Sequence, residues 1–155
     1  SVQTTIPTGQ YDSSKLVNIG TNRWSVKPAI GISKRVSDYT FEFTADAEFY
    51  TTNDDFYGGI TRKQEPIYSA QVHALYTFRR SMWLAVGATY YKGGEYINDG
   101  IGMGNELRNS RLGVTFAMPI DKQNAIKIYG HSGINVRYGS EFDAIGIAWQ
   151  YLWAD

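Results

Sequence analysis

Polar and apolar residues alternate along most of this chain. In residues 41–49 the odd positions are Phe, Phe, Ala, Ala and Phe, and the even positions are Glu, Thr, Asp and Glu. Near the end, Trp149, Tyr151 and Trp153 alternate with smaller or polar residues in the same way. Because neighbouring side chains on a β-strand point to opposite faces, each such segment predicts a strand with one apolar and one polar face.

The alternation predicts eight strands and almost no helix. They cover residues 2–8, 24–33, 39–50, 67–78, 82–91, 109–118, 125–134 and 143–153. Most have about the 9 to 11 residues that a tilted strand needs to cross a bilayer. We therefore predict an all-β fold in which residues 1–155 form a single domain, an antiparallel up-and-down transmembrane β-barrel.

The connections between these strands differ in length in a regular way. Long links rich in Gly, Asn and Asp cover 9–23, 51–66 and 92–108, and short turns cover 34–38, 79–81 and 120–124. Successive links in such a barrel lie at opposite ends, so the long links share one end. Outer-membrane barrels combine short periplasmic turns with long external loops. The link 135–142 is of middling length and fits this rule less well.

Composition leaves the membrane interpretation open and weakens several others. Fifteen acidic residues balance fifteen basic ones, and cysteine is absent. The chain therefore has no general attraction for nucleic acid, no disulfides and no thiolate sites. No apolar run is long enough for a membrane helix. The negative mean hydropathy is compatible with a barrel, in which only every second side chain faces lipid.

Aromatic residues gather near both ends of the predicted strands. The predicted membrane girdles contain Trp24, Tyr68 and Tyr90 near the long links, and Phe78, Trp149, Tyr151 and Trp153 near the short turns. Amphipathic rings collect at the two membrane interfaces. The alternative is that these residues are simply common in strands.

The polar face could carry function. Residues predicted to line the lumen are Lys27, Glu42, Asp46, Glu48, Gln71, His73, Arg111, Lys127 and His131. In a closed barrel of eight strands the interior holds little more than side chains, so these groups would form a structural ion-pair core. In a barrel of about twelve strands they would line a channel instead.

Signals for catalysis or metal binding are weak. His73 and Ser69 share a face but lie roughly 13 Å apart along a strand, which is beyond hydrogen-bond reach. The Asn and Asp residues at 53–55 and 98–99 could hold calcium together with loop carbonyls, yet Asn and Asp are ordinary loop residues. We therefore predict no catalytic residue, no metal, no cofactor and no enzymatic activity.

Several motifs point to a known family. They are TGQYD at 8–12, NRW at 22–24, NDDF at 53–56, YYKGG at 90–94, NSRLG at 109–113 and GIAWQY at 146–151. With them the chain resembles the bacterial outer-membrane transporter family of the meta-pathway of phenol degradation. The resemblance implies a location in the outer membrane, contact with its lipid, and transport of small aromatic or hydrophobic molecules. Family members are longer, which implies that this chain is the C-terminal part of a barrel of about twelve strands.

Three functional hypotheses remain from the sequence. The first is a passive outer-membrane channel or transporter for small molecules. The second is a soluble lipocalin-like barrel, in which the aromatic face would point inward around an apolar ligand. The third is a membrane barrel that conducts nothing and serves as an anchor or an adhesive surface.

Overall fold

Eight strands form one antiparallel sheet, in which each strand pairs with the next one along the sheet. The computed structural model describes residues 1–78, 81–139 and 141–153. The strands of this main sheet, in order, are β1 (Val2–Thr5), β2 (Ser25–Val36), β3 (Tyr39–Tyr50), β6 (Ile67–Thr77), β7 (Trp83–Gly93), β10 (Leu107–Pro119), β11 (Asn124–Val136) and β12 (Ala144–Tyr151). The all-β antiparallel prediction is confirmed. Arg79 and Arg80, which belong to the predicted turn 79–81, lie outside the described residues.

A second, smaller sheet lies in the long links, where the sequence predicted loops only. It contains β4 (Asn53–Phe56), β5 (Ile60–Gln64), β8 (Tyr96–Asn98) and β9 (Ile101–Gly102), and a 3-10 turn, η1 (Tyr57–Gly59), follows β4. These strands are too short to show an alternating pattern, and they form because β5 of one link pairs with β8 of another. The eight strands predicted from the sequence do not include these four. Among the described residues, no helix has the length and apolar character needed to span a membrane.

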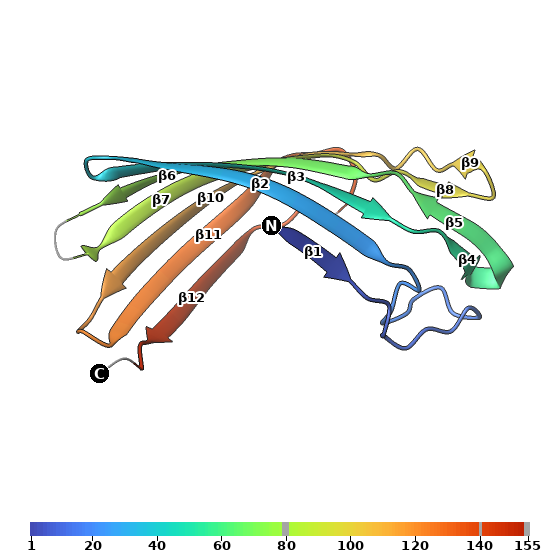
Figure 1. The fold of residues 1–155 in the computed structure, drawn as a ribbon, viewed down its shortest axis with the longest axis horizontal. Helices are drawn as coiled ribbons and strands as arrows, with labels where there is room; N and C mark the ends of the chain where they lie inside the picture. The colour runs from blue at the N-terminus through green and yellow to red at the C-terminus, as the bar shows by residue number, and fades with distance from the viewer. Residues whose placement is uncertain (79–80, 140, 154–155) are drawn as a thin grey trace.

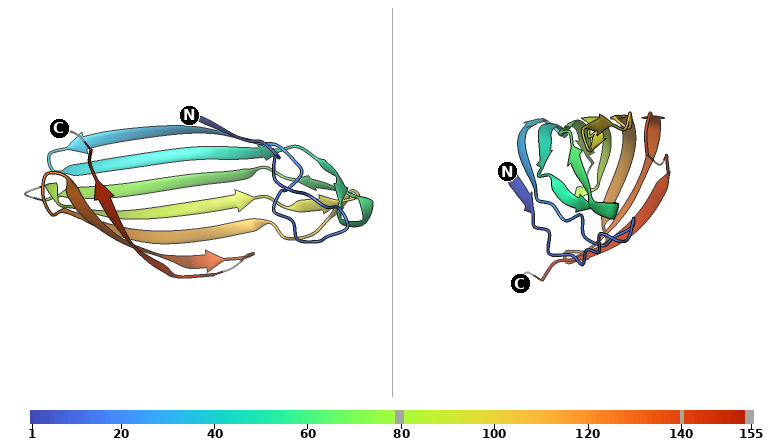
Figure 2. Two further views of the ribbon diagram at one scale, coloured as in Figure 1. Left: turned by 90° about the horizontal axis from the view of Figure 1, so that it is seen from below. Right: turned by 90° about the vertical axis from the view of Figure 1, so that its right-hand side faces the viewer.

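The main sheet is an open arch rather than a closed barrel. Figure 1 shows its strands curving over a concave side, and the end view in Figure 2 shows a trough. The sheet ends at β1 on one edge and at β12 on the other, and the described residues of these two strands do not pair. The eight strands therefore do not close into a barrel of their own. An open sheet with this curvature is what a segment of a wider barrel wall would form.

The long links lie at one end of the arch. The second sheet and the segment 9–23 extend past the right-hand end of the strands in Figure 1, and the turns from β2 to β3 and from β10 to β11 lie at the opposite end. This arrangement agrees with the predicted sorting of long links and short turns. The link that follows β11 begins at the long-link end, because Val136 pairs with Asn109 near the start of β10.

The two faces of the arch differ in chemistry. Ile32, Phe43 and Val72 are neighbours across β2, β3 and β6, and they are 69%, 44% and 50% exposed. On β3 and β6 the adjacent positions on the other face are polar and less exposed, because side chains converge on the concave side of a curved sheet; they are Glu42, Thr44, Gln71 and His73. Among the described residues, Ala85 and Ala117 are the only buried hydrophobic ones. This chain therefore has a large apolar outer surface and almost no apolar core.

One short turn is held by a single carboxylate. Asp121 Oδ1, between β10 and β11, accepts hydrogen bonds from the backbone N–H groups of Gln123 and Asn124, both at 2.8 Å. These bonds favour the ionised form and hold the pKa of Asp121 below its ordinary value.

We expect this turn to loosen in acid. A lowered pKa means that the carboxylate stabilises the folded turn above about pH 4, and that this contribution is lost as the pH falls through the pKa in the folded state. Hydrogen exchange at the Gln123 and Asn124 amides should therefore accelerate relative to the other turns in acid. Asp121→Ala should exchange fast at every pH, and an unchanged rate in that variant would contradict the assignment.

Candidate functional site

The polar residues predicted from the sequence lie together on the concave face of the main sheet. β2 carries Lys27; β3 carries Glu42, Asp46 and Glu48; β6 carries Gln71 and His73; β10 carries Arg111; and β11 carries Lys127 and His131. The register brings them to one face, because Glu42 pairs with His73 and that row continues through β7 and β10 to His131.

A single ion pair joins two of these residues in the described part of the chain. Lys27 Nζ lies 3.2 Å from an Asp46 carboxylate oxygen, and the Asp46 side chain is 5% exposed. Glu48 accepts a hydrogen bond from Ser25 Oγ at 2.7 Å, and Glu42 accepts one from Ser33 Oγ at 3.4 Å. The described residues therefore do not form the cross-barrel ion-pair core expected for eight closed strands.

Two histidines flank a hollow in the middle of the concave face. His73, Gly87, Gly113 and His131 occupy neighbouring positions on β6, β7, β10 and β11. A Cβ atom at Gly87 would lie 2.3 Å from His73 Cδ2, so the His73 ring covers this glycine. The hollow has a volume of about 280 Å³, and Thr89 and Arg111 also contribute to its wall. Small residues thus leave room on the polar wall where larger ones would fill it.

An aromatic side chain from a link lies against this wall. The Arg111 guanidinium carbon is 4.0 Å from the centre of the Phe142 ring, and the His131 ring meets the same ring edge-on at 5.8 Å. Arg111 Nη2 also donates to the Phe142 carbonyl at 3.4 Å. Phe142 is not among the residues predicted from the sequence, because it lies in a link without periodicity. No local signal could have placed it beside Arg111.

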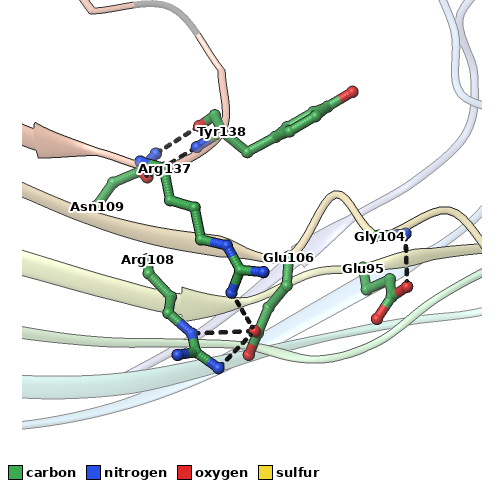
Figure 3. A network of polar contacts seen from close by, with 7 residues as sticks. All are labelled: Glu95, Gly104, Glu106, Arg108, Asn109, Arg137 and Tyr138. Carbon is green, nitrogen blue, oxygen red and sulfur yellow. Dashed lines mark hydrogen bonds and ion pairs between the residues drawn. The ribbon is translucent and has the colours of Figure 1, made fainter.

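Polar contacts fasten the same link to β10 at the long-link end (Figure 3). One Glu106 carboxylate oxygen lies 2.9 Å from Arg108 Nη2 and 3.2 Å from Arg137 Nη1. The Asn109 side chain accepts from the Arg137 backbone N–H at 3.0 Å and donates to the Tyr138 carbonyl at 2.8 Å. These groups connect β10 to the chain that follows β11, and they define the rim of the trough there.

The aromatic residues predicted as girdles are exposed. Their exposed fractions lie between 37% and 88%, and the residues are Trp24, Tyr68, Phe78, Tyr90, Trp149, Tyr151 and Trp153. The last two rings contact each other edge-on at 4.8 Å, and Tyr151 also lies 6.1 Å from Trp149. They form an aromatic cluster at the short-turn end of β12.

The described residues offer little for catalysis or metal binding. Within residues 1–78, 81–139 and 141–153, no group of three His, Cys, Asp or Glu side chains could hold a metal ion. Ser69 Oγ is buried and makes no hydrogen bond to a described residue, so it is not paired with His73. The chemistry of the concave face is that of a polar surface with charges of both signs.

Comparisons with known proteins agree with this geometry. The family described as "Putative MetA-pathway of phenol degradation" matches residues 1–150. The crystal structure of an outer-membrane channel from Pseudomonas putida F1 matches with a TM-score of 0.84 and 26% identity, over 97% of this chain and 57% of that one. This chain thus spans little more than half the length of that channel. A search of curated proteins gives no match.

The comparisons confirm the resemblance found in the sequence. The antiparallel sheet is similar to the wall of an outer-membrane barrel, and this likeness places the protein in the bacterial outer membrane. The chain belongs to the family described by its putative role in phenol degradation, whose match covers nearly its whole length.

Proposed function

We propose that this chain forms part of the wall of an outer-membrane channel for passive passage of small molecules, including aromatic and hydrophobic ones. The observation that carries the proposal is the separation of the two faces. Exposed apolar side chains cover the convex side, and Glu42, Asp46, Arg111 and Lys127 share the concave side. A soluble protein would bury the first set, whereas a membrane channel turns it toward lipid and keeps the second set in water.

The aromatic residues support this orientation through their spacing along the strands. Tyr68 lies near the start of β6 and Phe78 directly follows its end, ten residues further along the chain. At about 3.3 Å per residue they are roughly 33 Å apart along the strand. A tilt of about 40° reduces this to about 25 Å across the membrane, which is the usual height of the apolar band of such barrels. We infer that the two aromatic groups mark the two membrane interfaces.

The concave face suits a water-filled lumen. It carries the carboxylates Glu42, Asp46 and Glu48, and the cations Arg111 and Lys127 face the same side without a carboxylate partner within the described residues. Such charges need water unless they are paired. An open sheet that is part of a wider barrel provides that space. The aromatic class of solute is supported by the family description and not by a pocket on this face.

The lipocalin-like alternative is contradicted by the direction of the side chains. It requires the apolar face to point inward, yet Ile30, Ile145 and Ile147 lie outside and are at least 74% exposed. The alternative of a membrane anchor without a pore keeps the same orientation. Steady conductance across a planar bilayer would separate it from the channel, because a plugged barrel passes no steady current.

Arg111→Glu should make the channel more selective for cations. This change reverses one charge on the concave wall, and its effect on the reversal potential should be clear near 0.1 M salt, where screening extends over about 10 Å. The effect should shrink near 1 M salt, where the screening length is about 3 Å. Reversal potentials under a salt gradient provide the measurement.

Lys34→Glu is the matched control, because it reverses one charge on the convex face near a short turn. Lys34 pairs with Phe41 and therefore shares the apolar side. We expect its selectivity to equal that of the unchanged protein. Equal selectivity of Arg111→Glu and the unchanged protein would contradict a lumen on the concave side.

A further inference from the structure

A cavity lies outside the main sheet, between the segment 9–23 and the second sheet. Its volume is about 140 Å³. Since one water occupies about 30 Å³ of liquid, this space suits a few waters or one small molecule. Its principal wall residues are Tyr11, Arg23, Asn53, Phe56, Arg62 and Tyr96.

Two guanidinium groups converge on this cavity through shared aromatic rings. The guanidinium carbon of Arg62 lies 3.4 Å from the centre of the Phe56 ring and 4.9 Å from that of Tyr96. That of Arg23 lies 5.6 Å from Tyr96 and 4.6 Å from Tyr50. Both cations thus approach the Tyr96 ring, and flat apolar surfaces adjoin them.

The cations have polar partners but no carboxylate partner within the described chain. Arg62 Nε donates to Asn98 Oδ1 at 2.9 Å, and Arg23 Nη2 donates to Gln64 Oε1. Neither side chain forms an ion pair with a described residue. Arg23 Nη1 is buried without a hydrogen-bond partner among the described residues. A buried, charged donor without an acceptor is costly, so an acceptor at this position would be favourable.

Electrostatics agree with this geometry. Burial is the main cause that lowers the pKa of Arg62, and the positive charge of Arg23 lowers it further. Two like charges in a partly desolvated place repel each other. An anion bound between them would relieve the repulsion and satisfy the free N–H group.

The cavity wall is held in place by a buried asparagine. Asn53 is 3% exposed, and its Nδ2 donates to the Tyr11 hydroxyl at 3.0 Å and to the Thr21 carbonyl at 3.2 Å. The Tyr11 hydroxyl in turn donates to the Asp55 carbonyl at 2.9 Å. These bonds fasten the segment 9–23 to β4. The site is therefore largely formed before any ligand arrives.

We propose that this cavity is a binding site for a small carboxylate with a flat, apolar body. The carboxylate would accept from Arg23 Nη1 and from the Arg62 guanidinium, whose planar forks match carboxylate oxygens. The apolar body would lie against Phe56 and Tyr96. The site belongs to the long links and does not depend on conductance through the barrel, so each of the two proposals can fail without the other.

Calorimetric titration of the refolded protein in detergent with benzoate tests the proposal. Binding should be detectable for benzoate and absent for benzamide, which has the same ring without the charge. Arg62→Gln and Arg23→Gln should each weaken benzoate binding about tenfold to a hundredfold, because each removes a charged hydrogen-bond donor. Heat-modifiable gel migration of each variant shows whether it has folded.

Lys63→Gln is the matched control for Arg62→Gln. Lys63 is the next residue on β5, carries the same charge, and is exposed on the other side of the strand. We expect its benzoate affinity to be unchanged. The proposal is overturned if the folded protein does not bind benzoate, if benzamide binds equally well, or if the folded Arg62→Gln and Lys63→Gln variants bind benzoate alike.

Discussion

Val114→Arg should destabilise the folded barrel by about 2–4 kcal/mol, which is the cost of an arginine at the middle of the lipid-facing surface of such a barrel. Val114 lies near the middle of β10, pairs with Val86 and Gly130, and is 49% exposed on the convex face. In a soluble protein an exposed valine would tolerate this change with little loss. The large expected loss of stability therefore comes from placing the arginine charge against lipid.

Thr115→Arg is the control for this prediction. Thr115 is the next residue on β10, pairs with Ala85 and Tyr129, and lies on the concave face. If that face contacts water, the new charge stays solvated and the folded state loses much less free energy. Urea titrations of both variants in lipid vesicles, followed by heat-modifiable gel migration, give the comparison. A cost for Thr115→Arg that equals or exceeds the cost for Val114→Arg would reverse the assignment of the two faces.

Lys27→Ala should cost about 1–3 kcal/mol, since it leaves a buried carboxylate without its cation. The Asp46 side chain is 5% exposed, whereas the Lys27 side chain is 35% exposed. The loss of Lys27 and the loss of Asp46 should therefore have different effects on the free energy of unfolding. Asp46→Ala should cost less, because the lysine left behind can turn toward water, whereas the carboxylate left by Lys27→Ala cannot.

Two further variants make this prediction specific. The double variant Lys27→Met with Asp46→Leu removes both charges and should recover much of the loss, as replacement of buried pairs by apolar residues often does. Lys127→Ala removes a concave-face lysine that lies 6.0 Å from the Trp83 ring. Its expected cost is at most about 1 kcal/mol. Equal denaturation midpoints for Lys27→Ala and Lys127→Ala would contradict the larger cost predicted for breaking the ion pair.

Much of the candidate site could be predicted because a strand assigns its faces locally. Once Phe41 and Phe43 are placed on the lipid side, Glu42 must point the other way, and no knowledge of the partner strand is needed. The same two-residue rule placed His73, Arg111 and His131 on one side of the sheet. This rule could not predict which charged side chains on neighbouring strands contact each other. Lys27 pairs with Asp46 and not with Glu48, because the register and the bond from Ser25 to Glu48 decide it.

The second sheet and the arginine cavity were beyond this kind of prediction. β5 and β8 are short and come from different links, so their pairing is a contact between distant segments. Arg23 and Arg62 are far apart in the sequence and meet only because Tyr96 lies between them. β11 also has one extra residue at a bulge opposite Ser110 and Arg111. Odd and even positions exchange faces at this bulge, so the alternation of polar and apolar residues along β11 is weaker.

The sequence by itself determined that this protein is a wall of alternating strands with one face for lipid and one for polar groups. It could do so because the direction of a side chain on a strand depends only on the parity of its position. The tertiary structure alone decided that the eight strands stay open, which charges meet, and how the long links enclose a cavity. Those features depend on contacts between residues that are distant in the chain, and no local pattern encodes them.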